Sequence, residues 1–196
     1  MDLLSRIASH FRDAINLHEQ CLQEMAGPAA AAAEVLFMAL ASNCKILACG
    51  NGGSASDAQH FVAELVGRFE RERLPLAAIA LNTDTSILTA VGNDYGYEEV
   101  FARQVSALGQ PGDVLVAIST SGNSPSVLRA VESAQEREMI VIALTGKGGG
   151  ALGAMLGPMD HHLCVPHDRT MRIQEVHGLL LHALCDSIDL QLLGES

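Results

Sequence analysis

Four short apolar segments, each ending in glycine or small polar residues, constrain the fold of this chain more than any other feature. They cover residues 45–50, 76–82, 113–120 and 139–146. Each is almost continuously apolar, as expected of strands that helices cover on both faces. A weaker segment of the same kind, 161–166, follows them. The sequence therefore predicts a sheet of five strands buried inside the molecule.

The residues between these segments have helical periodicity, over 54–67, 98–108 and 124–136, and a long helix is expected over 170–192. Alternation of strands and helices predicts a parallel sheet with right-handed crossovers. The expected fold class is therefore α/β, a three-layer α/β/α sandwich with a five-stranded parallel sheet.

Two helices should precede the first strand, over 3–25 and 28–41, because Gly27-Pro28 is expected to end the first of them. A length of 196 residues fits a single domain. We expect residues 1–42 to form the leading helices of this domain and residues 43–196 its α/β core.

Composition excludes several classes of function. The formal net charge of −11 opposes binding to nucleic acid or to an anionic membrane, and the low aromatic content of 4% argues against stacking on bases. The five cysteines show no CxxC spacing, and the first residues do not resemble a secretory leader. The apolar stretch 29–41 is too short to span a bilayer. We therefore expect a reduced, cytoplasmic protein with no membrane segment.

Hydroxyl groups gather after the third apolar segment, in the sequence STSGNS of residues 119–124. Pro125 suits the first position of a helix, which Ser124 would cap. Hydroxyls, backbone N–H groups and the helix dipole can together hold a phosphate group. An ordinary hydroxyl-rich turn would show the same pattern, so both interpretations stay open.

A glycine-rich loop, residues 50–53, follows the first apolar segment, and Ser54 with Asp57 resembles a helix cap with its acidic partner. Neither GxxxxGK[ST] nor GxGxxG occurs at these loops. A nucleotide ligand is therefore not favoured.

Two helices offer residues suited to acid–base chemistry or to zinc. His60 and Glu64 are four residues apart and share a helical face, whereas Gln174 and His182 are eight residues apart, or roughly 12 Å in rise. The four could bind zinc or form an acid/base pair. They could equally be a solvated surface pair and packed histidines, and spacing alone does not select His182 over His177.

Five motifs, in order and at their intervals, closely resemble those of the bacterial phosphoheptose isomerases, which have the sugar isomerase (SIS) fold. They are CGNGGSASDAQHFVAEL, NTDTSILTAVGNDYGYEEVFARQV, GDVLVAISTSGNS, ALTGKGGG and RIQEVHGLLLH. The resemblance extends from about residue 45 to residue 188. It implies a SIS domain with a flavodoxin-like sheet and two leading helices.

The resemblance also implies an activity: isomerisation of sedoheptulose 7-phosphate to D-glycero-D-manno-heptose 7-phosphate through an enediol. This is the first step of ADP-heptose synthesis for the lipopolysaccharide core. By the same resemblance the protein is a homotetramer with sites shared between subunits, the leading helices lie at subunit interfaces, and each subunit holds one Zn²⁺ ion.

The resemblance assigns site residues as well. Glu64 would be the general base and His182 its acid/base partner. Phosphate would be bound by Ser119, Thr120, Ser121 and Ser124, the sugar by Asn51, Gly52, Gly53, Glu64, Asn93, Asp94 and Gln174, and zinc by His60, Glu64, Gln174 and His182.

Two other functions are alternatives to the isomerase. A related tetramer of this fold binds the bacterial replication initiator instead of catalysing a reaction, and RFERER, IALNTD and ALCDSID are reminiscent of it. The presence of both Glu64 and His182 favours the enzyme. A sugar-phosphate sensor that regulates transcription is ranked last, because the chain lacks the length and the basic patch of a DNA-binding domain.

Overall fold

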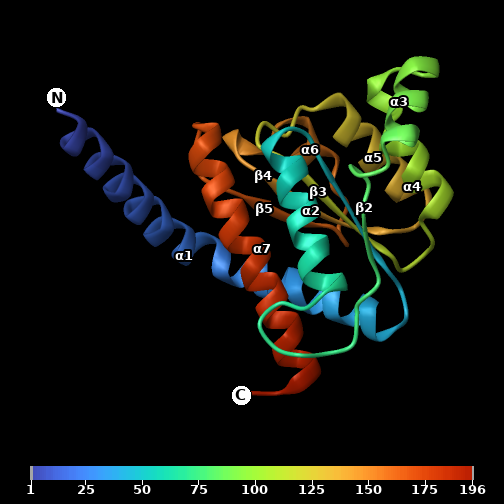
Figure 1. The fold of residues 1–196 in the computed structure, drawn as a ribbon, viewed down its shortest axis with the longest axis horizontal. Helices are drawn as coiled ribbons and strands as arrows, with labels where there is room; N and C mark the ends of the chain where they lie inside the picture. The colour runs from blue at the N-terminus through green and yellow to red at the C-terminus, as the bar shows by residue number, and fades with distance from the viewer. Residues whose placement is uncertain (1, 196) are drawn as a thin grey trace.

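A five-stranded parallel sheet lies at the centre of the computed structural model, which describes residues 2–195 (Figure 1). The strand order is β2-β1-β3-β4-β5, the flavodoxin-like order that the resemblance implied. The predicted fold class is confirmed. The strands are β1 (Ile46–Gly50), β2 (Ala78–Ala80), β3 (Val114–Ser119), β4 (Ile140–Thr145) and β5 (His161–Cys164).

Successive strand residues pack into two separate cores, one on each face of the sheet. Ile46 and Ala48 of β1 face one core, and Leu47 and Cys49 face the other, and all four are fully buried. Burial on both faces explains why the strands are continuously apolar instead of alternating.

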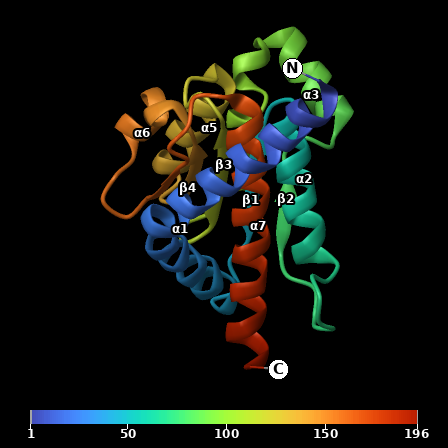
Figure 2. The ribbon, with the colours of Figure 1, turned by 90° about the vertical axis from the view of Figure 1, so that its left-hand side faces the viewer.

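Helices cover both faces, which makes the three layers. On one face lie α1 (Leu3–Ala41), α2 (Gly53–Val66) and α7 (Thr170–Leu193), and on the other α4 (Ala102–Leu108), α5 (Pro125–Glu136) and α6 (Gly150–Met155). Figures 1 and 2 show α2 and α7 side by side, running in the same direction. This pair carries the predicted acid/base residues.

The prediction of two leading helices is wrong, because α1 is one helix that contains Pro28. Proline removes one backbone hydrogen bond and disfavours a straight helix, and Figure 2 shows α1 changing direction part-way along its length. Buried residues on both sides of the proline, including Met25 and Ala32, pack the helix against the core. This packing outweighs the local cost of the proline.

The continuity of α1 also changes the argument about membranes. Among residues 2–195, α1 is the one helix long and apolar enough to cross a bilayer by length and composition. The expectation that this region is too short depended on a break at Pro28. One such helix is weak evidence for a span, since core helices of soluble proteins pass the same test, and part of α1 is buried on the domain.

Three further elements differ from the predictions. The helix expected over 98–108 is a short 3-10 turn, Tyr97–Glu99, followed by α4. Helix α3 (Thr85–Asp94) was not predicted; none of its residues is buried, and it meets the core through the partly buried Leu88 and Val91. Helix α6 and the 3-10 turn Lys147–Gly149, within and just after the motif ALTGKGGG, were not predicted.

Candidate active site

Strands β1 and β3 are neighbours, although β2 comes between them in sequence, so the chain leaves their carboxyl ends toward opposite sides of the sheet. In open parallel sheets this position forms a crevice that binds ligands. The glycine loop after β1 and the hydroxyl loop after β3, residues 119–124, therefore lie beside each other. Asn51 ties the glycine loop to the start of α5, the helix that follows the hydroxyl loop, since its Nδ2 donates to Ser126 Oγ at 2.9 Å.

The hydroxyl loop is held in shape by its own side chains. Ser119 is only 3% exposed, and its Oγ donates to Ser124 Oγ at 3.1 Å. Ser124 is the N-cap residue of α5 with Pro125 behind it, as predicted, but its side chain makes no capping hydrogen bond to the helix. Two hydroxyls and the start of a 12-residue helix thus share one small region, which suits an anion.

The segment that follows β4 supports the hydroxyl loop, through the first turn of α6. Leu152 N donates to Gly122 O, and Ala151 N donates to Asn123 Oδ1, both at 2.9 Å. Gly122 has a φ of +64°, and a Cβ there would lie 1.8 Å from Gly149 O. Glycine is therefore required at the point where the two loops touch.

The glycine loop differs from its prediction in one respect. Helix α2 begins at Gly53 with Gly52 as its N-cap, so the expected cap by Ser54 is wrong. Ser54 is already inside the helix, where it is buried, and its N–H bonds to Asn51 O at 3.0 Å. A glycine at the cap, with φ +58°, lets the backbone turn sharply from β1 into α2.

Asp57 is a carboxyl group that the sequence analysis considered only as a capping partner. Its Oδ2 is buried and has no hydrogen-bond partner among residues 2–195. Burial raises the pKa of this carboxyl above its usual value, and the nearby His60 partly offsets the effect. A buried carboxyl oxygen without a partner costs free energy unless a water molecule or a ligand group reaches it.

Three of the four residues predicted for acid–base chemistry or zinc binding, His60, Glu64 and His182, lie together between α2 and α7. His60 Nε2 is 3.0 Å from Glu64 Oε1, and the rings of His60 and His182 meet edge-on with their centroids 5.0 Å apart. Phe69 packs beside this cluster, with its ring centroid 5.7 Å from that of His182. Cys185, one turn after His182, has its pKa raised to about 12, mainly by burial and further by the charge of Glu64.

Gln174 lies further along the same helix pair. A Cβ added to Gly53 would be 2.3 Å from Gln174 Nε2, so this amide rests directly on the glycine loop. Because α2 and α7 run in the same direction, Gln174 faces the start of α2 and His182 faces its middle. Gln174 and His182 are separated along the axis of α7. They can therefore contact one ligand only if it extends between them or if their side chains lean toward each other.

Zinc is the metal that the family resemblance implies for these residues. Zinc–nitrogen bonds of about 2.0 to 2.1 Å place the ring centres of two histidines on one tetrahedral ion roughly 5 Å apart, which matches the pair His60 and His182. Imidazole and carboxylate are suitable donors. Within residues 2–195, however, no group of three or more His, Cys, Asp or Glu side chains is arranged to hold a metal ion. The donors fit by type and by the spacing of the two imidazoles.

The structure distinguishes the two histidines that spacing left equivalent. His177 is fully buried, and its Nε2 lies 3.0 Å from Thr145 O. Burial lowers its pKa to about 4, so this ring is neutral at physiological pH. His177 is the packed histidine, and His182 is the one in contact with His60, the hydrogen-bond partner of Glu64.

Asn93 and Asp94 lie at the exposed end of α3, where the amide of Asn93 donates to Asp94 Oδ1 at 2.7 Å. Tyr97, which the sequence analysis did not single out, contacts the loops instead: its hydroxyl donates to Asn51 Oδ1 at 3.0 Å. The one sequence feature that could have pointed to Tyr97 as a site residue was its position inside the motif NDYGYEEVF.

Comparison with known proteins agrees with this geometry. The model of the SIS domain family matches residues 9–146. A phosphoheptose isomerase from Bordetella avium is 74% identical over 196 residues, covering all of both chains. The chain belongs to the phosphoheptose isomerase family.

Solved structures of family members have the same fold. The phosphoheptose isomerase of Neisseria gonorrhoeae superposes with a TM-score of 0.91 at 55% identity, over 96% of this chain and 99% of that one. The enzyme of Francisella tularensis gives a TM-score of 0.94 at 46% identity, with the same coverage. The predicted family resemblance is thus confirmed.

Proposed function

We propose that this protein converts sedoheptulose 7-phosphate to D-glycero-D-manno-heptose 7-phosphate. The observation that carries the proposal is that Glu64 of α2 and His182 of α7 both lie against His60, on the helix that begins at the glycine loop. Relatives that match over the full length are named phosphoheptose isomerases, which favours catalysis over the initiator-binding hypothesis.

The reaction moves a carbonyl group from C2 to C1 of the sugar. The Glu64 carboxylate takes a proton from C1, the C1–C2 double bond forms, and the former carbonyl oxygen receives a proton to give the enediol. The oxygen on C1 then loses its proton, the carbonyl forms there, and C2 is protonated. A positioned general base contributes on the order of 10² to 10⁴ in rate.

His182 is suited to carry protons between the two oxygens, since a neutral imidazole ring has one nitrogen that donates a proton and one that accepts a proton. The hydroxyl loop and the start of α5 would bind the phosphate, with Ser119, Thr120, Ser121 and Ser124 supplying hydroxyl groups. Asn51 and the glycine loop would line the sugar. These contacts fix the distance between the phosphorylated end and the reacting carbons.

We include zinc in the proposal, with His60, Glu64, Gln174 and His182 as its ligands. When bound, a zinc ion would stabilise negative charge on the sugar oxygens. A carboxylate bound to zinc is a weaker base. Glu64 would therefore either leave the metal during turnover or share the site with a metal whose role is structural.

We also propose that the protein is a homotetramer and that α1 forms subunit contacts. The first half of α1 projects from the domain (Figure 1) and exposes a row of large apolar side chains, among them Leu4, Ile7, Phe11 and Ile15. Such a row on a projecting helix is typical of an interface. A second copy of the chain is the occupant we propose, and light scattering coupled to gel filtration would test it.

We also propose that the protein lies in the cytoplasm and that its product supplies heptose for lipopolysaccharide. An enzyme acting on a sugar phosphate fits the reduced compartment that the free cysteines indicate.

The test is incubation of the purified chain with sedoheptulose 7-phosphate, with the products followed by NMR. We expect an aldose 7-phosphate to accumulate to equilibrium, and unphosphorylated sedoheptulose to react far more slowly. No aldose product, together with capture of the replication initiator, would instead support the initiator-binding hypothesis.

A further inference from the structure

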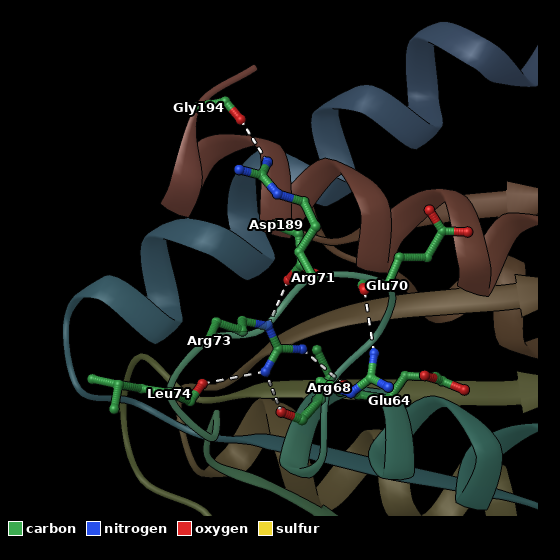
Figure 3. Close-up of polar contacts among 9 residues, drawn as sticks. Glu64, Arg68, Glu70, Arg71, Arg73, Leu74, Asp189 and Gly194 are labelled. Carbon is green, nitrogen blue, oxygen red and sulfur yellow. Dashed lines mark hydrogen bonds and ion pairs between the residues drawn. The ribbon is translucent and has the colours of Figure 1, made fainter. Parts of the chain in front are cut away.

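A buried arginine links the helix of the proposed base to the helix of its partner. Arg73 lies in the irregular segment 67–77 that follows α2 and folds back along it. Its guanidinium donates from Nη2 to Glu64 O at 2.8 Å and from Nη1 to Leu65 O at 2.9 Å (Figure 3). One of these two carbonyls belongs to the proposed base itself.

These contacts stabilise the end of α2 in two ways. The last carbonyls of a helix have no partners within the helix, and they carry the negative end of its dipole. Arg73 supplies both the hydrogen bonds and the positive charge. The backbone of Leu76 also donates to Leu65 O, at 3.0 Å, so the segment is fixed against the helix.

The other side of the guanidinium reaches α7. Arg73 Nε donates to Asp189 Oδ1 at 2.5 Å, and the two side chains are only 2% and 3% exposed. Asp189 follows His182 by seven residues and therefore lies on nearly the same face of α7, two turns further on. The arginine thus bonds to the backbone of Glu64 and to a side chain on the helix face that presents His182.

We propose that Arg73 and Asp189 are positioning residues that set the distance between Glu64 and His182. Neither touches the proposed reacting atoms, and each acts through the helix that it holds. The inference depends on the proposed isomerase function. It assigns to this ion pair the alignment of α7 with the last turn of α2, the turn that carries Glu64.

Arginine is required here because of its shape as well as its charge. The three nitrogen atoms of this planar group donate four hydrogen bonds. The acceptors are Asp189 for Nε, the carbonyls of Leu65 and Leu74 for Nη1, and the carbonyl of Glu64 for Nη2. A lysine could keep the pair with Asp189, but its single ammonium group cannot also bond both carbonyls in the same fork. Arg73→Lys therefore keeps the positive charge beside Asp189 and removes the hydrogen bonds that align α2 with α7.

Arg71 provides a matched control. It lies in the same segment and also reaches the end of α7, donating from Nη1 to Gly194 O at 2.7 Å, but it is not among the donors to α2 (Figure 3). Arg71→Lys changes the same residue type, in the same loop, with the same partner helix. It should leave both kcat and KM within twofold of the parent.

The first experiment measures kcat and KM for sedoheptulose 7-phosphate in the parent, Arg73→Lys, Asp189→Asn and Arg71→Lys proteins. Misplacement of a catalytic group by about 1 Å costs on the order of 10²-fold in rate. We expect kcat to fall by about 10- to 100-fold in Arg73→Lys and less in Asp189→Asn, with KM changed by less than about threefold, because the phosphate loop is untouched. Equal kcat in Arg73→Lys and Arg71→Lys would overturn the inference.

The second readout is the kinetic isotope effect with substrate deuterated at C1. A displaced base makes proton removal more rate-limiting, so the isotope effect should rise in Arg73→Lys. Loss of folded protein alone would lower the rate and leave the isotope effect at the parent value, and that result would contradict a positioning role.

A third readout does not depend on activity. Amide hydrogen exchange of peptides covering the last two turns of α2 should be faster in Arg73→Lys than in Arg71→Lys. If the parent protein does not isomerise the substrate, the proposed function fails while this exchange difference persists. If the parent is active and exchange in α2 is unchanged in Arg73→Lys, the positioning inference fails alone.

Discussion

Replacement of Gly122 by alanine tests how the phosphate loop is built. Gly122 has a φ of +64°, and an added Cβ would lie 1.8 Å from the carbonyl oxygen of Gly149. Contacts of this kind below 3.0 Å essentially never occur, so one of the two loops must move by more than 1 Å. Both are backbone segments joined by the bond from Leu152 N to Gly122 O, so neither moves freely.

The magnitude follows from two costs. The left-handed conformation costs a residue with a side chain roughly 1 to 2 kcal/mol, and overpacking against a fixed neighbour costs about 1 to 3 kcal/mol more. Gly148→Ala is the matched control, because Gly148 also has a positive φ, +75°, but an added Cβ there meets nothing within 4 Å. We expect Gly148→Ala to lose about 1 to 2 kcal/mol of the free energy of unfolding and Gly122→Ala about 2 to 5 kcal/mol.

The assay is urea unfolding of both variants at one protein concentration, followed by measurement of KM under conditions where each is folded. The KM of Gly122→Ala for the sugar phosphate should rise, since the shifted loop carries the proposed phosphate ligands. Equal losses of stability in the two variants would refute the argument that the two loops are in contact at Gly122. An unchanged KM would refute the assignment of the loop to phosphate.

Two predictions concern other parts of the molecule. Ser121→Ala should raise KM more than it lowers kcat, because a phosphate contact is made in both the ground state and the transition state; initial-rate kinetics that show a pure loss of kcat would count against the phosphate site. Stability should fall as the pH is lowered from about 6.5 toward 4, because the buried His177 has its pKa lowered to about 4 and the unfolded chain binds a proton that the folded chain excludes. The free energy of unfolding should drop by on the order of 1 to 3 kcal/mol over that window, and in His177→Gln this drop should be smaller; an identical pH dependence in both proteins would show that other groups cause it.

The sheet could be predicted from sequence because burial on both faces leaves a direct signal, a run of apolar residues that ends in glycine or a polar residue. The strands β1, β3 and β4 begin and end within a residue or two of their predictions for this reason. Helix α3 left no such signal, because none of its residues is buried. Its start depends on one local bond, from Ile87 N to the Asp84 side chain.

The leading helix shows where a local rule fails. Pro28 is a strong signal for a helix end, but tertiary packing on both sides of it keeps α1 continuous. Such packing comes from α7, more than a hundred residues away in sequence, and a local pattern carries no information about it.

The sequence predicted some residues of the candidate site better than others. His60 and Glu64 were predicted to share a face, and their hydrogen bond confirms it. That His182 rather than His177 joins them was implied by the family resemblance alone. Arg73 and Asp189 escaped notice because they are 116 positions apart and nothing local marks either of them as buried.

The most direct test of the central claim is solvent deuterium exchange at C1 of the bound substrate, in the parent protein and in Glu64→Gln. The amide keeps the size of the side chain and removes the base. We predict that the parent exchanges this hydrogen and forms product, whereas Glu64→Gln binds sedoheptulose 7-phosphate with similar affinity and does neither. Exchange at the parent rate in Glu64→Gln would contradict the assignment of Glu64 as the base.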